Sequence, residues 1–594
     1  MTTRPLTCLL ALLLLAVPAS ATSAQAPASE SAASPAPSDE VDRVARILAS
    51  MTLRQKVGQL FVSRVYGYRA KAPAPRAQRS NERYLGVADA RQLFARYPVG
   101  GIVYFDYAGN LQRPEQIARL SNGIQRAALE AGTVPVLIST DQEHGLIERL
   151  GPPATRFPGS MALGATRDPL LAREAARVTG EELRAVGIRQ NLAPVADVNS
   201  NPANPVIGVR AFGSRPGPVA RMVAAQVEGL QDDAGVAATV KHFPGHGDTR
   251  LDSHLGLPTI GRDRETWWAV DAPPFEAAIE AGVDVVMTAH VRVPALDPRG
   301  RPATLSGPIL SGILREQMGY DGVIMTDSLT MAGVRAKYRD ERVPVMALKA
   351  GADILADPHE LPLAFDAVMR AVRSGDIAEE RVDRSVERIL RLKERRGLLD
   401  EPMVEVEAVG ALLGKPDHDA VAQAVGEAAV TVLRDRRDLL PLPGDASVAL
   451  TGARPEGEGA LAGSLRRMGY EVDTAWTGLD PSLRQVARAQ RVARRNDLTV
   501  VVTRHLGPHP RQRQLVRRVL ASGARVILVF GSSPYDVTWF PDAPTQVVTY
   551  STVPAAMRGL AGVLSGRTEV RGTLPVRIPR PGGGGTLYPF GHGG

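Results

Sequence analysis

The residues 236–254, VAATVKHFPGHGDTRLDSH, combine a continuous apolar run with the most polar and imidazole-rich loop of the chain. The run 236–240 has the character of a buried strand. Pro244, Gly245 and Gly247 then exclude regular structure, so a loop follows the strand directly. The residues from 241 to 254 hold three His, two Asp and one Lys. A loop of this composition at a strand exit is an expected place for chemistry.

Two simple interpretations of this loop fit the sequence poorly. A metal site would use His242 and His246, which stand four residues apart as two ligands on one helix face do. However, Pro244 and Gly245 lie between them and break a helix, and no Cys is near, so we predict no metal. A purely structural loop is ordinary for one His, but three imidazoles in one loop need more explanation.

A catalytic loop is the third interpretation, and it uses Asp252 and His254. Because these two residues alternate with Ser253, an extended segment would point both side chains the same way. The carboxylate would then orient the imidazole and stabilise its protonated form. This pairing predicts that His254 acts as a general acid and base near neutral pH.

The sequence KHFPGHGDT, followed by DSH, resembles the signature of the bacterial β-N-acetylglucosaminidases of glycoside hydrolase family three. The resemblance implies that His254 is the catalytic acid/base and that Asp252 is its partner. It also implies that Lys241 and His242 contact the sugar.

Apolar runs alternate with amphipathic stretches over about the first 400 residues. The strand candidates are 58–65, 101–105, 134–139, 188–195, 236–240, 283–287, 323–325 and 352–355. Eight strands alternating with helices predict an α/β fold, a (β/α)8 TIM-type barrel over residues 39–397. A doubly wound open sheet is the alternative, since alternation alone fits both. Polar residues at the strand exits favour the barrel; they are Asp141, Asn199, Lys241, His242, His290, Asp327 and Asp357.

The remaining boundaries follow from composition. We expect a linker at 398–418, a smaller α/β sandwich domain at 419–580 with a mostly parallel sheet, and a flexible glycine-rich tail at 581–594. The strand candidates of the second domain are 447–450, 472–476, 498–503, 526–530 and 547–549. It contains no glycine-rich phosphate-binding motif, and we predict no cofactor.

The N-terminus has the pattern of a secretory signal peptide over residues 1–24. Arg4 precedes the apolar run 6–17 and then small residues, and a run this short does not span a membrane. A retained anchor is the alternative. Residues 25–38, rich in Ala, Ser and Pro, predict a disordered tether. We therefore expect export to the periplasm, the cell envelope or the medium, with no membrane span after cleavage. The only Cys of the chain, Cys8, would be lost with the signal.

Overall composition is that of an ordinary globular protein. The 594 residues are 44% hydrophobic and 23% charged, with a formal net charge of +8 carried mostly by Arg. No dense basic run with interleaved aromatic residues is present, which argues against a nucleic-acid partner. A diffuse positive surface would suit an anionic cell envelope.

The segment 322–331, GVIMTDSLTM, is a second candidate for chemistry. Its buried strand ends at Thr326, so Asp327 is the first residue at the exit and is placed to act as a nucleophile. A helix N-cap is an equally good interpretation of this Asp. The resemblance favours the nucleophile, because the family nucleophile sits in an equivalent strand-Thr-Asp segment.

Two further segments match the family. The resemblance assigns sugar binding to Asp141 and Arg149 in 141–150, DQEHGLIERL, and to Arg210 in 204–213, NPVIGVRAFG. Without the resemblance, each Arg would be interpreted as half of a surface ion pair. His144 replaces the first of two family glycines, and we expect its side chain to lie beside the pocket.

Together these features imply a retaining exo-β-N-acetylglucosaminidase that removes non-reducing terminal GlcNAc from peptidoglycan fragments. Its partner would be a carbohydrate, a GlcNAc-containing glycoside or muropeptide. Because a His acid/base removes one negative charge from the site, phosphate could approach the intermediate, and a β-N-acetylglucosaminide phosphorylase is an alternative. A β-glucosidase of the same family and a non-enzymatic cell-wall sugar-binding protein are two others.

Overall fold

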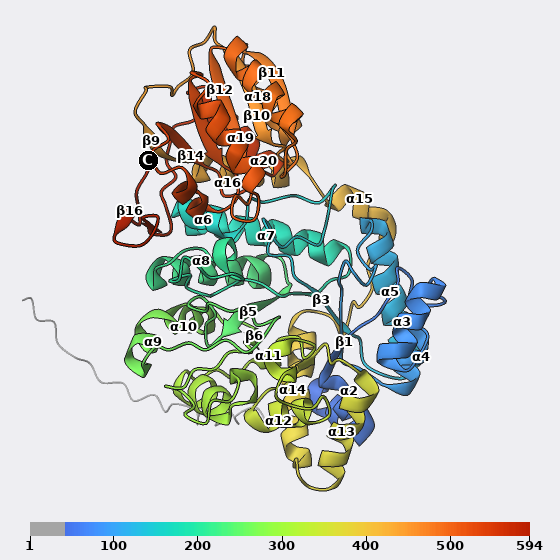
Figure 1. The fold of residues 1–594 in the computed structure, drawn as a ribbon. Coiled ribbons are helices and arrows are strands. Elements are labelled where there is room, and N and C mark those ends of the chain that lie inside the picture. The colour runs from blue at the N-terminus through green and yellow to red at the C-terminus, as the bar shows by residue number, and fades with distance from the viewer. Residues whose placement is uncertain (1–41) are drawn as a thin grey trace, which may run out of the picture. The chain divides into compact units, whose positions relative to one another are not determined.

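The computed structural model describes residues 42–594, so the predicted signal peptide at 1–24 and tether at 25–38 lie outside the described residues (Figure 1). No helix within the described range has both the length and the apolar content that a membrane crossing needs.

Eight short parallel strands form the first sheet, and each was predicted. They are β1 (Phe61–Arg64), β2 (Gly101–Val103), β3 (Leu137–Thr140), β4 (Gln190–Asn191), β5 (Ala237–Phe243), β6 (Val285–Thr288), β7 (Val323–Thr326) and β8 (Leu355–Ala356). Each strand pairs with the next in the chain, β1 also pairs with β8, and a parallel bridge from Met325 to Ile354 brings β7 to β8. The sheet is thus a nearly closed barrel, which confirms the predicted fold class.

Helices lie outside the barrel sheet (Figure 1). They are α1 (Arg43–Ser50), α2 (Leu53–Gln59), α3 (Pro75–Leu85), α4 (Ala90–Arg96), α5 (Pro114–Glu130), α6 (Ser160–Thr166), α7 (Pro169–Ala185), α8 (Pro216–Glu228), α9 (Arg264–Val270), α10 (Pro273–Glu280), α11 (Ala332–Arg335), α12 (Arg342–Ala350), α13 (Leu361–Arg373) and α14 (Glu379–Arg395), with a π-helix at Pro308–Gln317. Several begin with Pro, as α5, α7 and α8 do, because the first helical residue needs no N–H donor. Every residue of the barrel strands is buried, and most of these residues are apolar, although β4 consists of Gln190 and Asn191.

The second sheet has the order β11-β10-β12-β13-β14-β9. Its strands are β9 (Thr431–Asp435), β10 (Ser447–Ala453), β11 (Glu471–Thr477), β12 (Leu498–Thr503), β13 (Val526–Phe530) and β14 (Thr545–Val548). Five of them are parallel, as predicted, and β9 pairs antiparallel with β14 at the edge. Strand β9 was not predicted, because the half-exposed Arg434 and Asp435 interrupt the apolar pattern of this edge strand.

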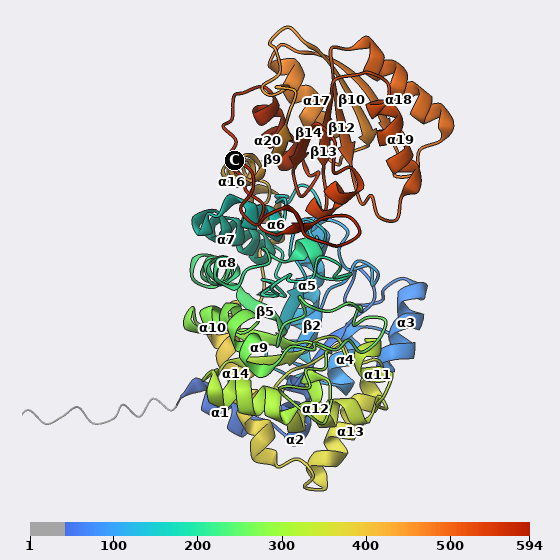
Figure 2. The same ribbon diagram turned by 60° about the vertical axis from the view of Figure 1, so that its left-hand side comes forward.

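Helices cover both faces of this sheet (Figure 2). They are α16 (Pro416–Ala429), α17 (Glu458–Arg467), α18 (Leu483–Arg495), α19 (Pro510–Leu520) and α20 (Pro554–Leu564). Alternate strand residues face opposite ways: Val501 lies in one core with α18 and α19, whereas Val500 lies in the other with α17 and α20. This three-layer arrangement is the predicted sandwich domain.

Two connecting segments are more ordered than expected. The predicted linker 398–418 contains α15 (Val409–Leu412) and the start of α16, and its buried His418 contacts Glu181 and Glu182 of α7 at 3.0 Å each. The prediction of a flexible tail at 581–594 is wrong. Strand β16 (Thr586–Tyr588) pairs with β15 (Ile578–Pro579), and His592 Nε2 lies 2.8 Å from the Leu433 carbonyl. These pairings offset the flexibility of the four consecutive glycines before β16.

Candidate active site

A cavity of about 300 Å³ opens where the barrel strands end. Seven of the eight predicted site residues line it: Asp141, Arg149, Arg210, Lys241, His242, His254 and Asp327. The eighth, Asp252, contacts His254 directly. Residues spread over almost 190 positions of sequence therefore meet at the carboxyl ends of parallel strands, where barrels place their active sites.

Asp327 lies one residue beyond β7, at the mouth of the barrel. Its Oδ1 accepts a hydrogen bond from the Ser328 N–H at 2.7 Å. Burial alone would raise the pKa of this carboxyl group, but the imidazoles of His290 and His242 and the Ser328 N–H lower it overall. The N-cap interpretation is wrong, because the next helix, α11, begins only after Met331. Asp327 is an ionised carboxylate facing the cavity.

Asp252 and His254 form a close pair, although not through an extended segment as we expected. The chain turns here: the N–H groups of Leu255 and Gly256 both donate to the Asp252 carbonyl. Asp252 Oδ1 accepts from the His254 backbone N–H at 2.8 Å and from the ring Nδ1 at 2.7 Å. Burial would raise the pKa of Asp252, but these bonds lower it. The His254 side chain is 61% exposed, and its Nε2 is left for a ligand.

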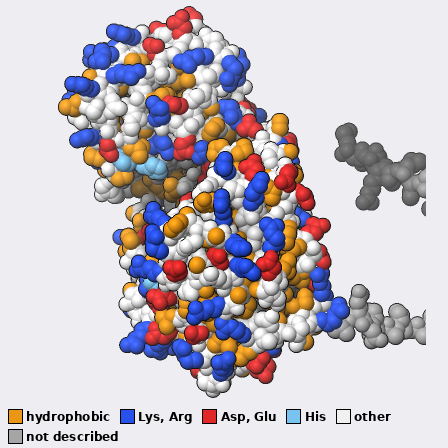
Figure 3. Space-filling model, turned by 90° about the vertical axis from the view of Figure 1, so that its right-hand side faces the viewer, with side chains coloured by type: hydrophobic (Ala, Val, Ile, Leu, Met, Phe, Trp, Pro, Cys, Tyr) orange, Lys and Arg blue, Asp and Glu red, His pale blue; other side chains and the backbone are white. Residues whose placement is uncertain are grey.

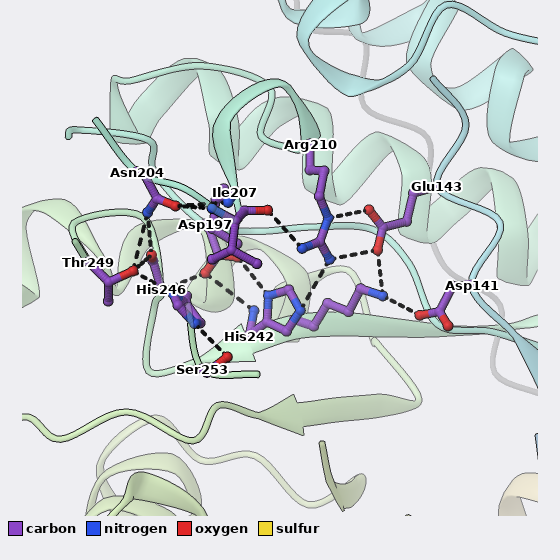
Figure 4. A network of polar contacts seen from close by, with 12 residues as sticks. Asp141, Glu143, Asp197, Asn204, Ile207, Arg210, His242, His246, Thr249 and Ser253 are labelled. Carbon is purple, nitrogen blue, oxygen red and sulfur yellow. Dashed lines mark hydrogen bonds and ion pairs between the residues drawn. The ribbon is translucent and has the colours of Figure 1, made fainter. Parts of the chain in front are cut away.

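Four charged side chains on the wall of the cavity form one ion-pair network (Figure 4). Lys241 Nζ lies 2.7 Å from both Asp141 Oδ1 and Glu143 Oε1. Glu143 also accepts two hydrogen bonds of 2.8 Å from the guanidinium of Arg210. Burial alone would raise the pKa of Glu143, but Arg210 and Lys241 hold it far below its usual range. The charges of two cations and two anions thus cancel in a largely buried cluster.

Two members of this region, Glu143 and Asp197, were not predicted from the sequence. Asp197 is fully buried, and its Oδ2 accepts from His242 Nδ1 at 2.7 Å. Its Oδ1 accepts from the His246 backbone N–H at 2.6 Å, so one carboxylate fixes the start of the loop at two points (Figure 4). Its position just beyond the predicted strand 188–195 was the available signal. Asn199, the exit residue that we named instead, donates to the Tyr535 hydroxyl at 3.0 Å.

His246 holds the loop together from inside. Its Nδ1 lies 2.7 Å from Thr249 Oγ1, and its Nε2 lies 2.9 Å from Ser253 Oγ. Burial lowers its pKa to about 4. Both ring nitrogens of His246 thus bond side chains of its own loop, whereas Nδ1 of His242 bonds Asp197. Within residues 42–594, no three His, Cys, Asp or Glu side chains cluster in a way that suits a metal ion.

His144 does not lie beside the pocket, and that expectation is wrong. Its backbone has φ of 64°, a left-handed conformation that a glycine adopts without strain. The ring turns away from the cavity, with Nε2 2.8 Å from Thr179 Oγ1 and its edge against Phe157. Arg149, by contrast, lines the cavity and pairs with Asp106 at 3.2 Å.

Two of the other strand-exit residues support the segment after β7. His290 Nε2 lies 2.9 Å from the Ser328 carbonyl. Ser328 Oγ donates to Asp357 Oδ2 at 2.8 Å, and Arg64 pairs with the other oxygen of Asp357 at 2.5 Å. These contacts hold the residue next to Asp327 from both sides and so fix the carboxylate.

A parallel barrel with a cavity lined by charged side chains at the carboxyl ends of its strands defines a class, the TIM-type barrel enzymes. The comparisons with known proteins are more specific. The model described as glycosyl hydrolase family 3 N terminal domain matches residues 52–392, and the model described as glycosyl hydrolase family 3 C-terminal domain matches 430–593. The chain belongs to glycoside hydrolase family 3, and it is a glycoside hydrolase.

Relatives along most of the chain agree with this. Beta-hexosaminidase A of Pseudoalteromonas piscicida is 30% identical over 555 residues, which covers 82% of this chain and 90% of that protein. A beta-N-acetylglucosaminidase/beta-glucosidase of Cellulomonas fimi is 30% identical over 578 residues, which covers 91% of this chain and 96% of that protein. The solved structure of a family 3 beta-N-acetylglucosaminidase from Paenibacillus sp. str. FPU-7 matches with a TM-score of 0.81 at 40% identity. The match covers 89% of this chain and 99% of that one.

Proposed function

We propose that this glycoside hydrolase is a retaining exo-β-N-acetylglucosaminidase that removes non-reducing terminal GlcNAc from peptidoglycan fragments. The observation that carries the proposal is the cavity shared by the carboxylate of Asp327 and the imidazole of His254. One supplies a nucleophile and the other supplies a proton, the two functions that retaining hydrolysis requires.

In the first step, a carboxylate oxygen of Asp327 attacks the anomeric carbon, and the glycosidic bond breaks. Protonated His254 gives its Nε2 proton to the leaving oxygen. Asp252 stabilises the imidazolium before this transfer, because its Oδ1 holds Nδ1 at 2.7 Å. The products are a free aglycone and a sugar joined to Asp327 by an ester bond.

In the second step, neutral His254 removes a proton from water at Nε2. The water oxygen bonds to the anomeric carbon, and Asp327 leaves as a carboxylate. The protonated imidazole is then ready for another cycle. Only one carboxylate needs to be ionised near the reacting carbon, whereas most glycosidases use two.

The ion-pair network supports binding of the sugar in this proposal. Asp141 is bonded through one oxygen to Lys241 Nζ and lies at the cavity, where its other oxygen is available to a sugar hydroxyl. Arg210 and His242 are held in place by Glu143 and Asp197 respectively. Side chains fixed in this way lose little conformational entropy when a sugar binds.

The substrate class rests on the relatives named beta-hexosaminidase and beta-N-acetylglucosaminidase, together with the site residues that this chain shares with the family signature. The signal-like sequence at residues 1–24 supports export, which would bring the enzyme to peptidoglycan fragments. The mass of the mature N-terminus, measured on protein from native cells, tests export directly. An intact Met1 would contradict it.

Product analysis tests the reaction. The protein is incubated with an aryl β-GlcNAc, with and without inorganic phosphate, and the sugar products are separated. We expect free GlcNAc with the β configuration in both buffers at the earliest times. GlcNAc 1-phosphate formed only with phosphate would assign a phosphorylase instead. No product from this substrate, but release from an aryl β-glucoside, would assign a β-glucosidase.

A further inference from the structure

The outer surface of helices α18 and α19 is strongly cationic. The two helices pack against each other and against one face of the second sheet. Their sequences, LRQVARAQRVARR and PRQRQLVRRVL, contain nine Arg and no Asp, Glu or aromatic residue. This layer is therefore built from a single kind of charge.

The excess positive charge of the whole protein lies in this domain. Residues 419–594 hold 22 Arg, no Lys and 14 Asp or Glu, so they carry the entire formal charge of +8 and the preceding residues sum to zero. Figure 3 shows basic side chains, in blue, spread over the upper part of the molecule, which this domain forms. The charge is a local property of one domain rather than a diffuse one.

Helical spacing arranges the arginines into stripes. We define the arginine face as six exposed residues that recur at intervals of three, four or seven: Arg484, Arg488, Arg491, Arg495, Arg511 and Arg518. Such intervals place side chains on one side of a helix. On the opposite side, Val486, Ala489 and Ala493 are buried against the sheet. Two adjacent helices bearing these stripes present one broad cationic face.

Among the described residues, none of the six arginines of this face has a carboxylate partner within ion-pair distance. Asp480 pairs with His509 at 2.8 Å, Asp497 accepts from Ser447 at 2.7 Å, and Asp473 accepts from Asn496 at 3.1 Å. The arginines of residues 419–594 that do form ion pairs lie outside this face: Arg454, Arg504, Arg558 and Arg571. Like charges placed together without partners repel one another, and an external anionic surface would relieve that repulsion.

We propose that the arginine face binds the surface of an anionic lipid bilayer by charge, without insertion. We favour a bilayer over a single-stranded nucleic acid, since neither helix offers an aromatic side chain for base stacking and the guanidinium of Arg513 covers the neighbouring Trp539 ring at 4.1 Å. A face made of helix sides is also broad enough for several arginines to meet lipid phosphates together, and each adds to the attraction. This proposal does not depend on which sugar the barrel hydrolyses.

The test compares two variants that lose the same number of charges. The stripe variant removes the four arginines of α18 that belong to the arginine face: Arg484→Gln, Arg488→Gln, Arg491→Gln and Arg495→Gln. The matched control removes four exposed arginines around a second cavity on the barrel: Arg69→Gln, Arg91→Gln, Arg119→Gln and Arg126→Gln. Thermal unfolding and hydrolysis of an aryl β-glycoside are measured for both, to show that each folds and remains active.

Binding is measured by co-sedimentation with phosphatidylcholine vesicles, with or without about one third phosphatidylglycerol. We expect the wild-type protein to bind only the anionic vesicles and to be released by about 0.5 M salt. The stripe variant should bind at least roughly tenfold more weakly, and the control should bind like the wild type. Equal binding by the stripe variant and the wild type would overturn the proposal, as would an equal loss in the control. Tighter binding to duplex DNA than to the anionic vesicles would also overturn it.

Discussion

Asp252 holds both the backbone and the ring of His254: one carboxylate oxygen accepts the His254 N–H at 2.8 Å and Nδ1 at 2.7 Å. Two residues within one turn thus orient each other, and Ser253 between them is held by the Gly333 N–H at 3.0 Å and by His246 Nε2 at 2.9 Å. The same Asp252 oxygen fixes where the ring stands and which nitrogen is left for chemistry. This relationship makes the proposed role of His254 testable with a series of leaving groups.

His254→Ala should slow hydrolysis of substrates with poor leaving groups by roughly a hundredfold or more, since their oxygen needs a proton as it departs. For activated aryl glycosides, the rate of the glycosylation step should fall far less, because their leaving oxygen needs little protonation. The measurement is kcat/KM against leaving-group pKa. Asp252→Asn should shift the same plot in the same direction, but less, because the ring stays and only its carboxylate is lost. Equal losses for all leaving groups would show that His254 is not the acid.

Asp327→Ala should reduce turnover by at least about a thousandfold, because the glycosyl ester cannot form without the carboxylate. Asp321→Asn is the matched control, since this 87% exposed carboxylate precedes the same strand β7 at its opposite end. It should leave kcat near the wild-type value. Initial rates with an aryl β-GlcNAc, and thermal unfolding of both variants, provide the measurement. Near wild-type activity in Asp327→Ala would remove its role as nucleophile.

Glu143→Gln should destabilise the fold as well as weaken binding. Glu143 is the carboxylate shared by Lys241 and Arg210, and its loss leaves two buried cations with only Asp141 close to one of them. Breaking a buried ion pair from one side costs about 3–5 kcal/mol. We expect a lower unfolding midpoint in urea and a higher KM. Asp106→Asn, at the exposed ion pair with Arg149, should change stability by less than about 1 kcal/mol. If Glu143→Gln and Asp106→Asn lowered the free energy of unfolding by the same small amount, the ion-pair network would not be a stabilising unit.

His246 should make stability depend on pH. Its folded pKa is about 4, against an ordinary value of 6.5. Above pH 6.5 both states are neutral, so the contacts of the buried ring contribute fully. As pH falls from 6.5 to 4, the unfolded chain binds a proton that the folded state does not, and stability falls by at most about 3 kcal/mol.

His246→Gln should therefore be less stable than the wild type at pH 7, because the ring contacts with Thr249 and Ser253 are lost. The difference should shrink toward pH 4, since Gln does not titrate. Urea unfolding at pH 7, 5.5 and 4 gives the free energies. A difference that stays constant with pH would show that His246 does not titrate with a lowered pKa.

Much of the fold followed from local patterns. All eight barrel strands and five of the six strands of the second sheet were predicted, because most of them are apolar runs that can be recognised without knowledge of their neighbours. Strand β9 was missed for the converse reason: an antiparallel edge strand carries charged residues, and only its pairing with β14 defines it. The tail at 581–594 was misjudged likewise, since its order comes from contacts with Leu433 and β15 rather than from its own sequence.

The sequence by itself determined the local chemistry of this protein. Asp252 and His254 are two residues apart, and Asp327 follows its strand directly, so chain connectivity keeps the first two close together and puts Asp327 at the end of β7. Only the tertiary structure decided which carboxylates complete the site. Lys241 meets Asp141 across 100 residues, Arg210 meets Glu143 across 67, and His242 meets Asp197 across 45. The order of parallel strands around the barrel sets these contacts, because it brings the ends of distant segments to one mouth.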